Sequence, residues 1–214
     1  MNKKYLLIGI VALILVIGLT WAYIESTKPL PGQEALQDSR THIPEGSPTN
    51  YKFNPPTSGD HYPSWITKGV YDTPRPDGNL VHSLEHGYII FWYDCEKKLA
   101  FSLQPSALSN LIPAAFAQVL PMTQSGEGSP SAKLEDMPKA FSDGSCNNLE
   151  SQLKDIYNQF GQHKLIVVPR VGIDHPLVVT SWGRMLKLER IDKDQIKRFI
   201  NFFRDHGPEQ TNEP

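Results

Sequence analysis

Residues 81–93 read VHSLEHGYIIFWY and contain both a fold signal and a chemical signal. The last six residues are aromatic or β-branched without a polar break, which predicts a buried strand. Residues 81–86 are expected to be helical, and Gly87 suits the C-terminal cap of a helix. In a helix, His82 and His86 share one face and both imidazoles can reach one ion. In a strand they would lie roughly 13 Å apart. The stretch therefore predicts a helix-to-strand junction at which two histidines could bind one ion.

The segments around this junction predict an α+β fold with an antiparallel sheet, flanking helices and a long Pro/Gly-rich N-terminal loop. Residues 42–80 are rich in Pro, Gly, Asp and Thr but also contain five aromatic residues, which favours ordered irregular structure over disorder. Asp192 and Gln195 suit a helix N-cap and its reciprocal partner. Further strands are expected at 99–103, 164–168 and 177–182, and helices at 106–120, 149–160 and 192–206.

The N-terminus predicts a membrane anchor ahead of the α+β domain. Residues 5–23 are uncharged and mostly aliphatic, and about 20 such residues span a bilayer as one transmembrane helix. Lys3 and Lys4 favour a cytoplasmic N-terminus and place the rest of the chain outside the cytoplasm. A cleaved signal peptide is the alternative, but residues 20–23 offer no small-residue cleavage site. The expected parts are a transmembrane anchor at 1–23, a linker at 24–40, an extracytoplasmic globular domain at 41–207 and a flexible tail at 208–214.

Cys95 and Cys146 are the two cysteines of the chain. An even number of cysteines in an exported domain predicts a disulfide. Closing a loop of about 50 residues stabilises a fold by roughly 4 kcal/mol in the chain-entropy model. A reactive thiol pair and a copper thiolate are the alternatives, although the two residues lack the close spacing of a redox pair.

The net charge of −2 and the pI of about 6.4 give no reason to expect nucleic acid as a partner. The expected partners are the lipid bilayer, through residues 5–23, and a candidate cell-envelope protein.

The chemistry is expected at the histidines. Several histidines close together in a sequence serve as metal ligands, as acid/base groups or as buried polar anchors. We expect His61, His82 and His86 to bind copper or zinc, with His42 or Met185 completing the ligand set. Asp60 or Glu85 would orient a ligand histidine. The alternative is an interaction module, in which the histidines brace the Pro-rich loop and exposed aromatic residues such as Trp65 contact the partner.

A third interpretation is a metal-dependent hydrolase. The spacing of His82, Glu85 and His86 is that of inverted zinc peptidases, in which two histidines bind zinc and the glutamate activates water. Glu85 would then be the catalytic base, and Glu135 or Glu150 would be the candidate for a third zinc ligand. The sequence leaves open whether the protein is an enzyme.

Three N-terminal motifs and the C-terminal portion resemble the domain-of-unknown-function 3105 family. The motifs are NPPTSGDHY at 54–62, KGVY at 68–71 and LVHSLEHG at 80–87, followed by TSWGR at 180–184 and the ending at 199–209. The resemblance covers roughly residues 38–209. It implies a small exported or membrane-anchored protein without an established activity, and residues 104–150 look like an insertion. It also marks one set of residues: His42, His61, His82, Glu85 and His86.

Overall fold

The computed structural model describes residues 3–37, 39–97, 137–144 and 146–212. The chain forms two compact units, Met1–Leu30 and Pro31–Pro214. The first unit is a single helix, α1 (Lys3–Ser26). Among the described residues, no helix combines the length and the apolar character that crossing a membrane requires. The structure therefore gives no support to the predicted transmembrane anchor.

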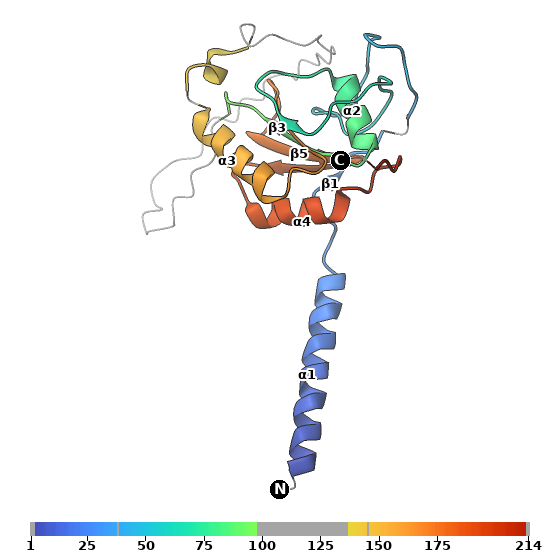
Figure 1. The fold of residues 1–214 in the computed structure, drawn as a ribbon, viewed down its shortest axis with the longest axis vertical. Helices are drawn as coiled ribbons and strands as arrows, with labels where there is room; N and C mark the ends of the chain where they lie inside the picture. The colour runs from blue at the N-terminus through green and yellow to red at the C-terminus, as the bar shows by residue number, and fades with distance from the viewer. Residues whose placement is uncertain (1–2, 38, 98–136, 145, 213–214) are drawn as a thin grey trace, which may run out of the picture. The chain divides into compact units, whose positions relative to one another are not determined.

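The second unit is built on one six-stranded sheet in the order β1-β6-β5-β3-β4-β2 (Figure 1). The strands are β1 (Gln33–Glu34), β2 (Gly69–Val70), β3 (Ile89–Tyr93), β4 (Leu165–Pro169), β5 (Leu177–Ser181) and β6 (Arg184–Leu188). The helices are α2 (Asp77–Glu85), α3 (Asn147–Gln159) and α4 (Lys193–Phe203), with the 3-10 turn η2 (Lys139–Phe141).

The sheet and its flanking helices confirm the α+β class. The sheet is mixed, however, so the prediction of an antiparallel sheet is wrong. β4 pairs in parallel with both β2 and β3. Antiparallel pairs join β3 to β5, β5 to β6 and β6 to β1. Parallel neighbours need a crossover connection, and the chain between β3 and β4 contains α3.

Helices cover both faces of the sheet, which explains the uninterrupted apolar run of β3. Ile89 and Phe91 belong to a core cluster with residues of α3 and α4. Ile90 and Trp92 belong to a second cluster with Leu80 and Leu84 of α2. Because successive side chains of a strand point to opposite faces, every residue of β3 is buried. Figure 1 shows α2 apart from α3 and α4, across the strands.

Local predictions agree well with the described elements. Asp192 caps α4: its Oδ1 accepts a hydrogen bond from the Gln195 N–H at 3.0 Å, and the Gln195 amide donates to Oδ2 at 2.9 Å. The disulfide joins Cys95, just after β3, to Cys146 at the start of α3, with a Cα–Cα distance of 5.3 Å. The strand predicted at 99–103 and the helix predicted at 106–120 lie outside the described residues.

Segments predicted as linker and tail take part in this unit. β1 extends the sheet by pairing with Arg184 and Met185, and Ala35 beside it is buried. Near the C-terminus, the Thr211 carbonyl accepts a hydrogen bond from the buried Lys164 ammonium at 2.8 Å. Residues 33–35 and Thr211 are therefore held by hydrogen bonds and packing within the folded unit.

Candidate metal centre

The helix-to-strand junction is present as predicted. α2 ends at Glu85, and His86 is its C-terminal cap residue. Gly87 follows with φ of +83°, a backbone conformation that glycine adopts without steric cost. Leu80 and Leu84 fix α2 on the sheet. His82, Glu85 and His86 are thereby held in nearly complete burial one turn before a central strand.

Two loop segments bring His42 and His61 to this helix. Their backbones form a short parallel bridge: the Ile43 N–H donates to the His61 carbonyl at 2.8 Å, and the His61 N–H donates to the Thr41 carbonyl at 3.0 Å. Asp60 holds the same segment, because its carboxylate accepts hydrogen bonds from the Ser39 hydroxyl and from the Thr41 N–H. The Ser39 bond is the main reason that the pKa of Asp60 lies below its usual value.

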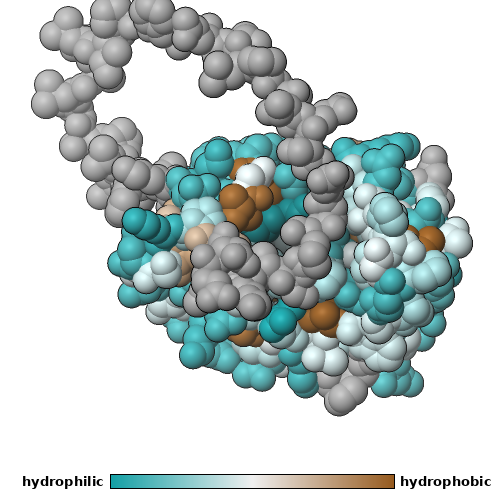
Figure 2. Space-filling model, turned by 90° about the horizontal axis from the view of Figure 1, so that it is seen from above, coloured by the Kyte–Doolittle hydropathy of each residue, from teal (hydrophilic) through white to brown (hydrophobic). Residues whose placement is uncertain are grey.

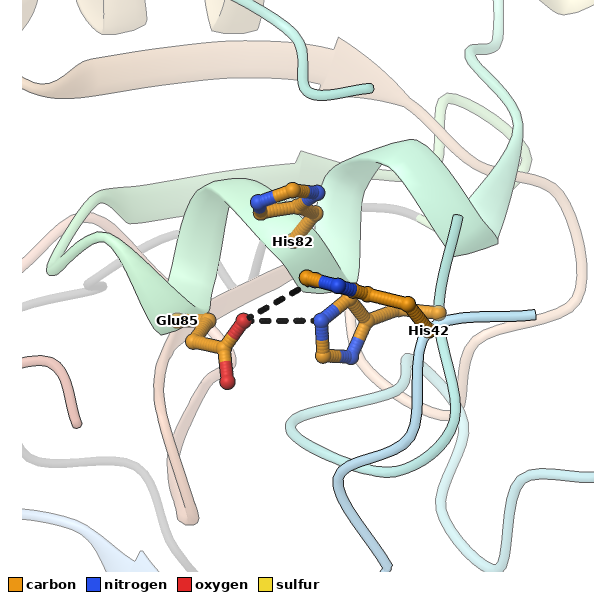
Figure 3. Close-up of side chains that lie close together, drawn as sticks. His42, His82 and Glu85 are labelled. Atoms are coloured by element: carbon orange, nitrogen blue, oxygen red, sulfur yellow. Dashed lines mark ion pairs between the residues drawn. The ribbon is translucent and has the colours of Figure 1, made fainter. Parts of the chain in front are cut away.

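Four side chains converge where the loop meets the helix: His42, His61, His82 and Glu85. One ligand atom from each lies within 4.8 Å of the corresponding atoms of the others. His82 and Glu85 extend from α2 toward His42 (Figure 3). The Glu85 Oε2 atom lies 2.8 Å from Nε2 of His61 and 3.7 Å from Nε2 of His42.

Backbone carbonyls fix the tautomers of two of these histidines. Nδ1 of His61 lies 2.8 Å from the Gly59 carbonyl, and Nδ1 of His82 lies 2.6 Å from the Tyr62 carbonyl. A carbonyl only accepts, so each Nδ1 carries the proton and each neutral ring keeps its lone pair on Nε2. A second ring nitrogen that donates to a carbonyl is the usual arrangement of metal-binding histidines.

His82 is also tuned toward the neutral form. Burial is the largest influence and lowers its pKa from the usual 6.5, and the nearby rings of His86, His61 and His42 lower it further. The Tyr62 carbonyl acts in the opposite direction. A neutral imidazole is the form that binds a metal, so His82 is prepared to bind at neutral pH.

The contact between His61 and Glu85 lacks a hydrogen bond. Nε2 of His61 and Oε2 of Glu85 are buried and lie 2.8 Å apart, yet neither atom has a hydrogen-bond partner. If His61 is neutral, its lone pair faces a carboxylate. An unsatisfied buried polar atom costs about 1–3 kcal/mol. A proton on Nε2, or a cation bound by both atoms, removes that cost.

Arg40 is a member of the site that the sequence reasoning missed. Its Nε lies 2.5 Å from Oε1 of Glu85, while Oε2 faces the histidines. The carboxylate is thus held from one side and left open on the other. The available signal was spacing, because Arg40 and His42 are two residues apart and side chains at that spacing share a face of an extended segment.

His86 belongs to a second, adjoining group rather than to the four-residue cluster. Its Nε2 lies 2.9 Å from Nε2 of His82 and 3.7 Å from Oε2 of Glu209. These three residues also place ligand atoms within 4.8 Å of one another. The half-exposed Trp65 lies over both rings, with its centroid 4.9 Å from that of His86 and 5.6 Å from that of His82. Glu209 lies in the predicted tail and had no local sequence signal.

The other predicted ligands have different surroundings. Glu150 accepts a hydrogen bond from the Tyr93 hydroxyl at 3.3 Å and lies beside the disulfide. It is on α3, across the sheet from α2, so it cannot be the third ligand of a peptidase site around His82. Met185 Sδ accepts a bond from the Gln33 amide at 3.8 Å. Glu135 lies outside the described residues.

Comparison with known proteins gives a family but no activity. A family model described as "Protein of unknown function (DUF3105)" matches residues 42–131 and 140–214. This range includes every residue of the four-residue cluster. No curated protein matches the chain, and no solved structure matches it.

Proposed function

The chain belongs to the DUF3105 family of proteins of unknown function, and from the geometry of its buried site we propose that it binds one transition-metal ion, zinc or copper(II). The ligands are His42, His61, His82 and Glu85, whose ligand atoms lie within 4.8 Å of one another. Three imidazole nitrogens and one carboxylate oxygen are donors that suit these two ions.

The observation that carries this proposal is the contact between His61 and Glu85. Nε2 of His61 and Oε2 of Glu85 lie 2.8 Å apart in the core, and neither atom has a hydrogen-bond partner; if His61 is neutral, its lone pair faces the carboxylate. Nδ1 of each of the two buried rings donates to a carbonyl, of Gly59 or of Tyr62, so each neutral ring has its lone pair on Nε2; in His82 this atom lies 2.9 Å from Nε2 of His86. Arg40 keeps the carboxylate in place through its other oxygen.

The same contacts favour Glu85 as a ligand over Glu85 as a catalytic base. Its carboxylate is 2% exposed: Oε1 pairs with Arg40, and Oε2 lies 2.8 Å from Nε2 of His61 and 3.7 Å from Nε2 of His42. Four protein ligands fill a tetrahedral shell, whereas a catalytic zinc keeps one position open for water. The ligand set therefore supports binding or carriage of the ion rather than hydrolysis.

The face of the molecule in Figure 2 gives little support to the alternative that the protein is an interaction module. Figure 2 shows a face that is mainly hydrophilic, with small separate apolar spots where described residues are uncovered. Trp65, the aromatic residue expected to contact a partner, is exposed as predicted and also lies against His82 and His86.

We propose further that the folded unit works outside the cytoplasm, at the cell membrane. The support is the disulfide between Cys95 and Cys146, because such bonds persist in oxidising compartments. Anchoring in the bilayer rests on the sequence of residues 5–23 alone. Alkaline carbonate extraction of cell membranes tests the anchor: an anchored chain stays in the pellet, and release into the supernatant would contradict it.

Elemental analysis tests the metal proposal. The full-length chain is purified from its native compartment without a histidine tag or chelator, beside Glu85→Gln, His61→Gln and the control His175→Gln. His175 pairs with Asp174, outside the cluster. We expect near-stoichiometric zinc or copper in the wild type and the control, and loss of the metal in the other two. Glu85→Gln is nearly isosteric, and circular dichroism confirms folding. A folded wild-type protein without metal would overturn the proposal.

A further inference from the structure

We propose that the bound ion has two alternative positions that share His82, and that it enters and leaves through the outer one. The inner position is formed by His42, His61, His82 and Glu85, and the outer position by His82, His86 and Glu209. This inference rests on the proposed metal binding and adds to it a path for exchange of zinc or copper(II).

His82 makes the two positions mutually exclusive. Its Nδ1 donates to the Tyr62 carbonyl at 2.6 Å, so Nε2 alone can bind a metal. A single lone pair holds a single ion. The two groups therefore cannot form a two-metal centre through His82, and the chain binds one ion in one position or the other.

The distance between the positions is short. Nε2 of His86 lies 2.9 Å from Nε2 of His82, which is close enough for both nitrogens to bind the same ion at ordinary zinc–nitrogen distances of about 2.0–2.1 Å. In the transfer, bonds from the ion to His86 and Glu209 form while bonds to His42, His61 and Glu85 break, and His82 stays bound. Binding through Nε2 uses the neutral form of His86 with its proton on Nδ1.

The two positions differ in how strongly they bind the ion, because they differ in burial and in the number of donor atoms. The inner position has four protein donors, of which His61 is fully buried and Glu85 is 2% exposed. The outer position has three, and it ends at Glu209, whose side chain is 46% exposed. A solvated carboxylate binds an ion more weakly than a desolvated one. The inner position, with more donors and the more buried carboxylate, therefore holds the ion, and the outer position lies on one of two ways to it from the solvent.

Backbone hydrogen bonds fix the segment of Glu209 to the C-terminal end of α2, which carries the inner ligand Glu85. The Glu209 N–H donates to the Glu85 carbonyl at 3.1 Å, and the Asp205 N–H donates to the Gly87 carbonyl at 3.0 Å. Between them, Gly207 approaches so closely that a Cβ atom there would lie 2.0 Å from the Glu85 carbonyl oxygen. The outer carboxylate is thus placed by the structure and does not reach the site from a loose tail.

His42 offers a competing route, because its side chain is 51% exposed. The two routes differ in which residue controls the rate. If the ion passes Glu209, removing that charge slows exchange and leaves the inner ligands intact. If it passes His42, Glu209 has no influence on the rate.

Stopped-flow exchange with the full-length chain separates the routes. Zn²⁺ uptake, and Zn²⁺ release to excess chelating dye, are measured for wild type, Glu209→Gln and the control Glu189→Gln, an exposed carboxylate that pairs with His175. We expect Glu209→Gln to slow both rates about tenfold. We expect one Zn²⁺ per chain in all three proteins, and we expect Glu189→Gln to keep the wild-type rates and an equilibrium affinity within about threefold of wild type.

Each other result overturns the inference in a distinguishable way. Normal binding with unchanged rates in Glu209→Gln would place entry beside His42 and leave the proposed metal function standing. Two Zn²⁺ ions per wild-type chain would show that the positions fill together. A wild-type chain that binds no Zn²⁺ and no copper would remove both the exchange path and the proposed function.

Discussion

The His61 Nε2 atom lies 2.8 Å from the Glu85 Oε2 atom in the core, and neither atom makes a hydrogen bond. Nδ1 of His61 donates to the Gly59 carbonyl, so a neutral His61 ring has its lone pair on Nε2, where it faces the carboxylate. Two electron-rich atoms at this distance need a proton or a cation. Since His42 and His82 each place a ring nitrogen within 4.8 Å of the ligand atoms of His61 and Glu85, one metal ion would satisfy all four side chains together.

Metal binding should stabilise the fold measurably. An ion at 100 times its Kd adds about 2.7 kcal/mol to the free energy of unfolding, and this raises the Tm of a domain of this size by roughly 5–10 °C. Calorimetry of the metal-free chain with and without Zn²⁺ or Cu²⁺ measures the shift. We expect the shift in wild type and in His175→Gln but not in Glu85→Gln. Equal shifts in all three proteins would mean that the ion binds elsewhere.

Gly59 should be needed for the position of His61. Its φ of +125° is strained for any side chain, and a Cβ there would lie 3.0 Å from the Gln37 amide nitrogen and 3.1 Å from the Tyr51 ring. We expect Gly59→Ala to destabilise the chain by about 1–3 kcal/mol and to weaken metal binding, because the Gly59 carbonyl orients the His61 ring.

Gly46→Ala is the matched control. Gly46 also has positive φ, at +77°, but a Cβ there meets no atom within 4 Å. Urea unfolding and metal titration of both variants are compared. Gly46→Ala should lose stability through backbone strain while keeping wild-type metal affinity. If both variants bind metal equally well, the Gly59 carbonyl does not control the site.

Reduction of the disulfide should weaken the fold but spare the site. Cys95 and Cys146 close a loop with a sequence separation of 51, which corresponds to roughly 4 kcal/mol in the chain-entropy model. The bond belongs to the core cluster of α3 and α4, across the sheet from α2. Urea unfolding after dithiothreitol treatment should show a stability loss of about 2–4 kcal/mol, and metal content per folded chain should not change. Loss of metal together with the disulfide would show that the two sites are linked.

Asp192 should make stability depend on acid pH. Hydrogen bonds from Gln195 hold the pKa of Asp192 below its ordinary value of 3.8. A lowered pKa in the folded state means that its stabilisation is complete above the unfolded-state pKa and is lost as pH falls through 3.8 toward the folded-state value. Asp192→Ala should cost about 1 kcal/mol at neutral pH. Asp192→Asn keeps an acceptor for the cap and should lose mainly the acid dependence, as unfolding curves at several pH values would show.

The helix-to-strand junction was predictable because its signals are local. The uninterrupted apolar run of β3 indicated a buried strand, and Gly87 indicated the end of α2. The cap at Asp192 and Gln195 was equally legible. These features depend on residues only a few positions apart, where propensity and periodicity act directly.

The arrangement of the site was less accessible because it depends on long-range contacts. The bridge between His42 and His61 joins segments 19 residues apart and is set by Asp60 and its partners at Ser39 and Thr41. Glu209 is held at the site by a backbone hydrogen bond to Glu85 that no local pattern encodes. The parallel pairing of β3 with β4 likewise depends on a crossover through α3.

Diffraction at the absorption edge of the bound metal tests the central claim most directly. Crystals of the full-length chain, loaded with Zn²⁺ or Cu²⁺, are measured on both sides of the edge. We predict one anomalous peak within bonding distance of Nε2 of His42, His61 and His82 and of the Glu85 carboxylate, about 2.0–2.2 Å for zinc. A peak away from these four side chains, or no peak with His61 and Glu85 still in contact, would contradict a metal centre at this junction.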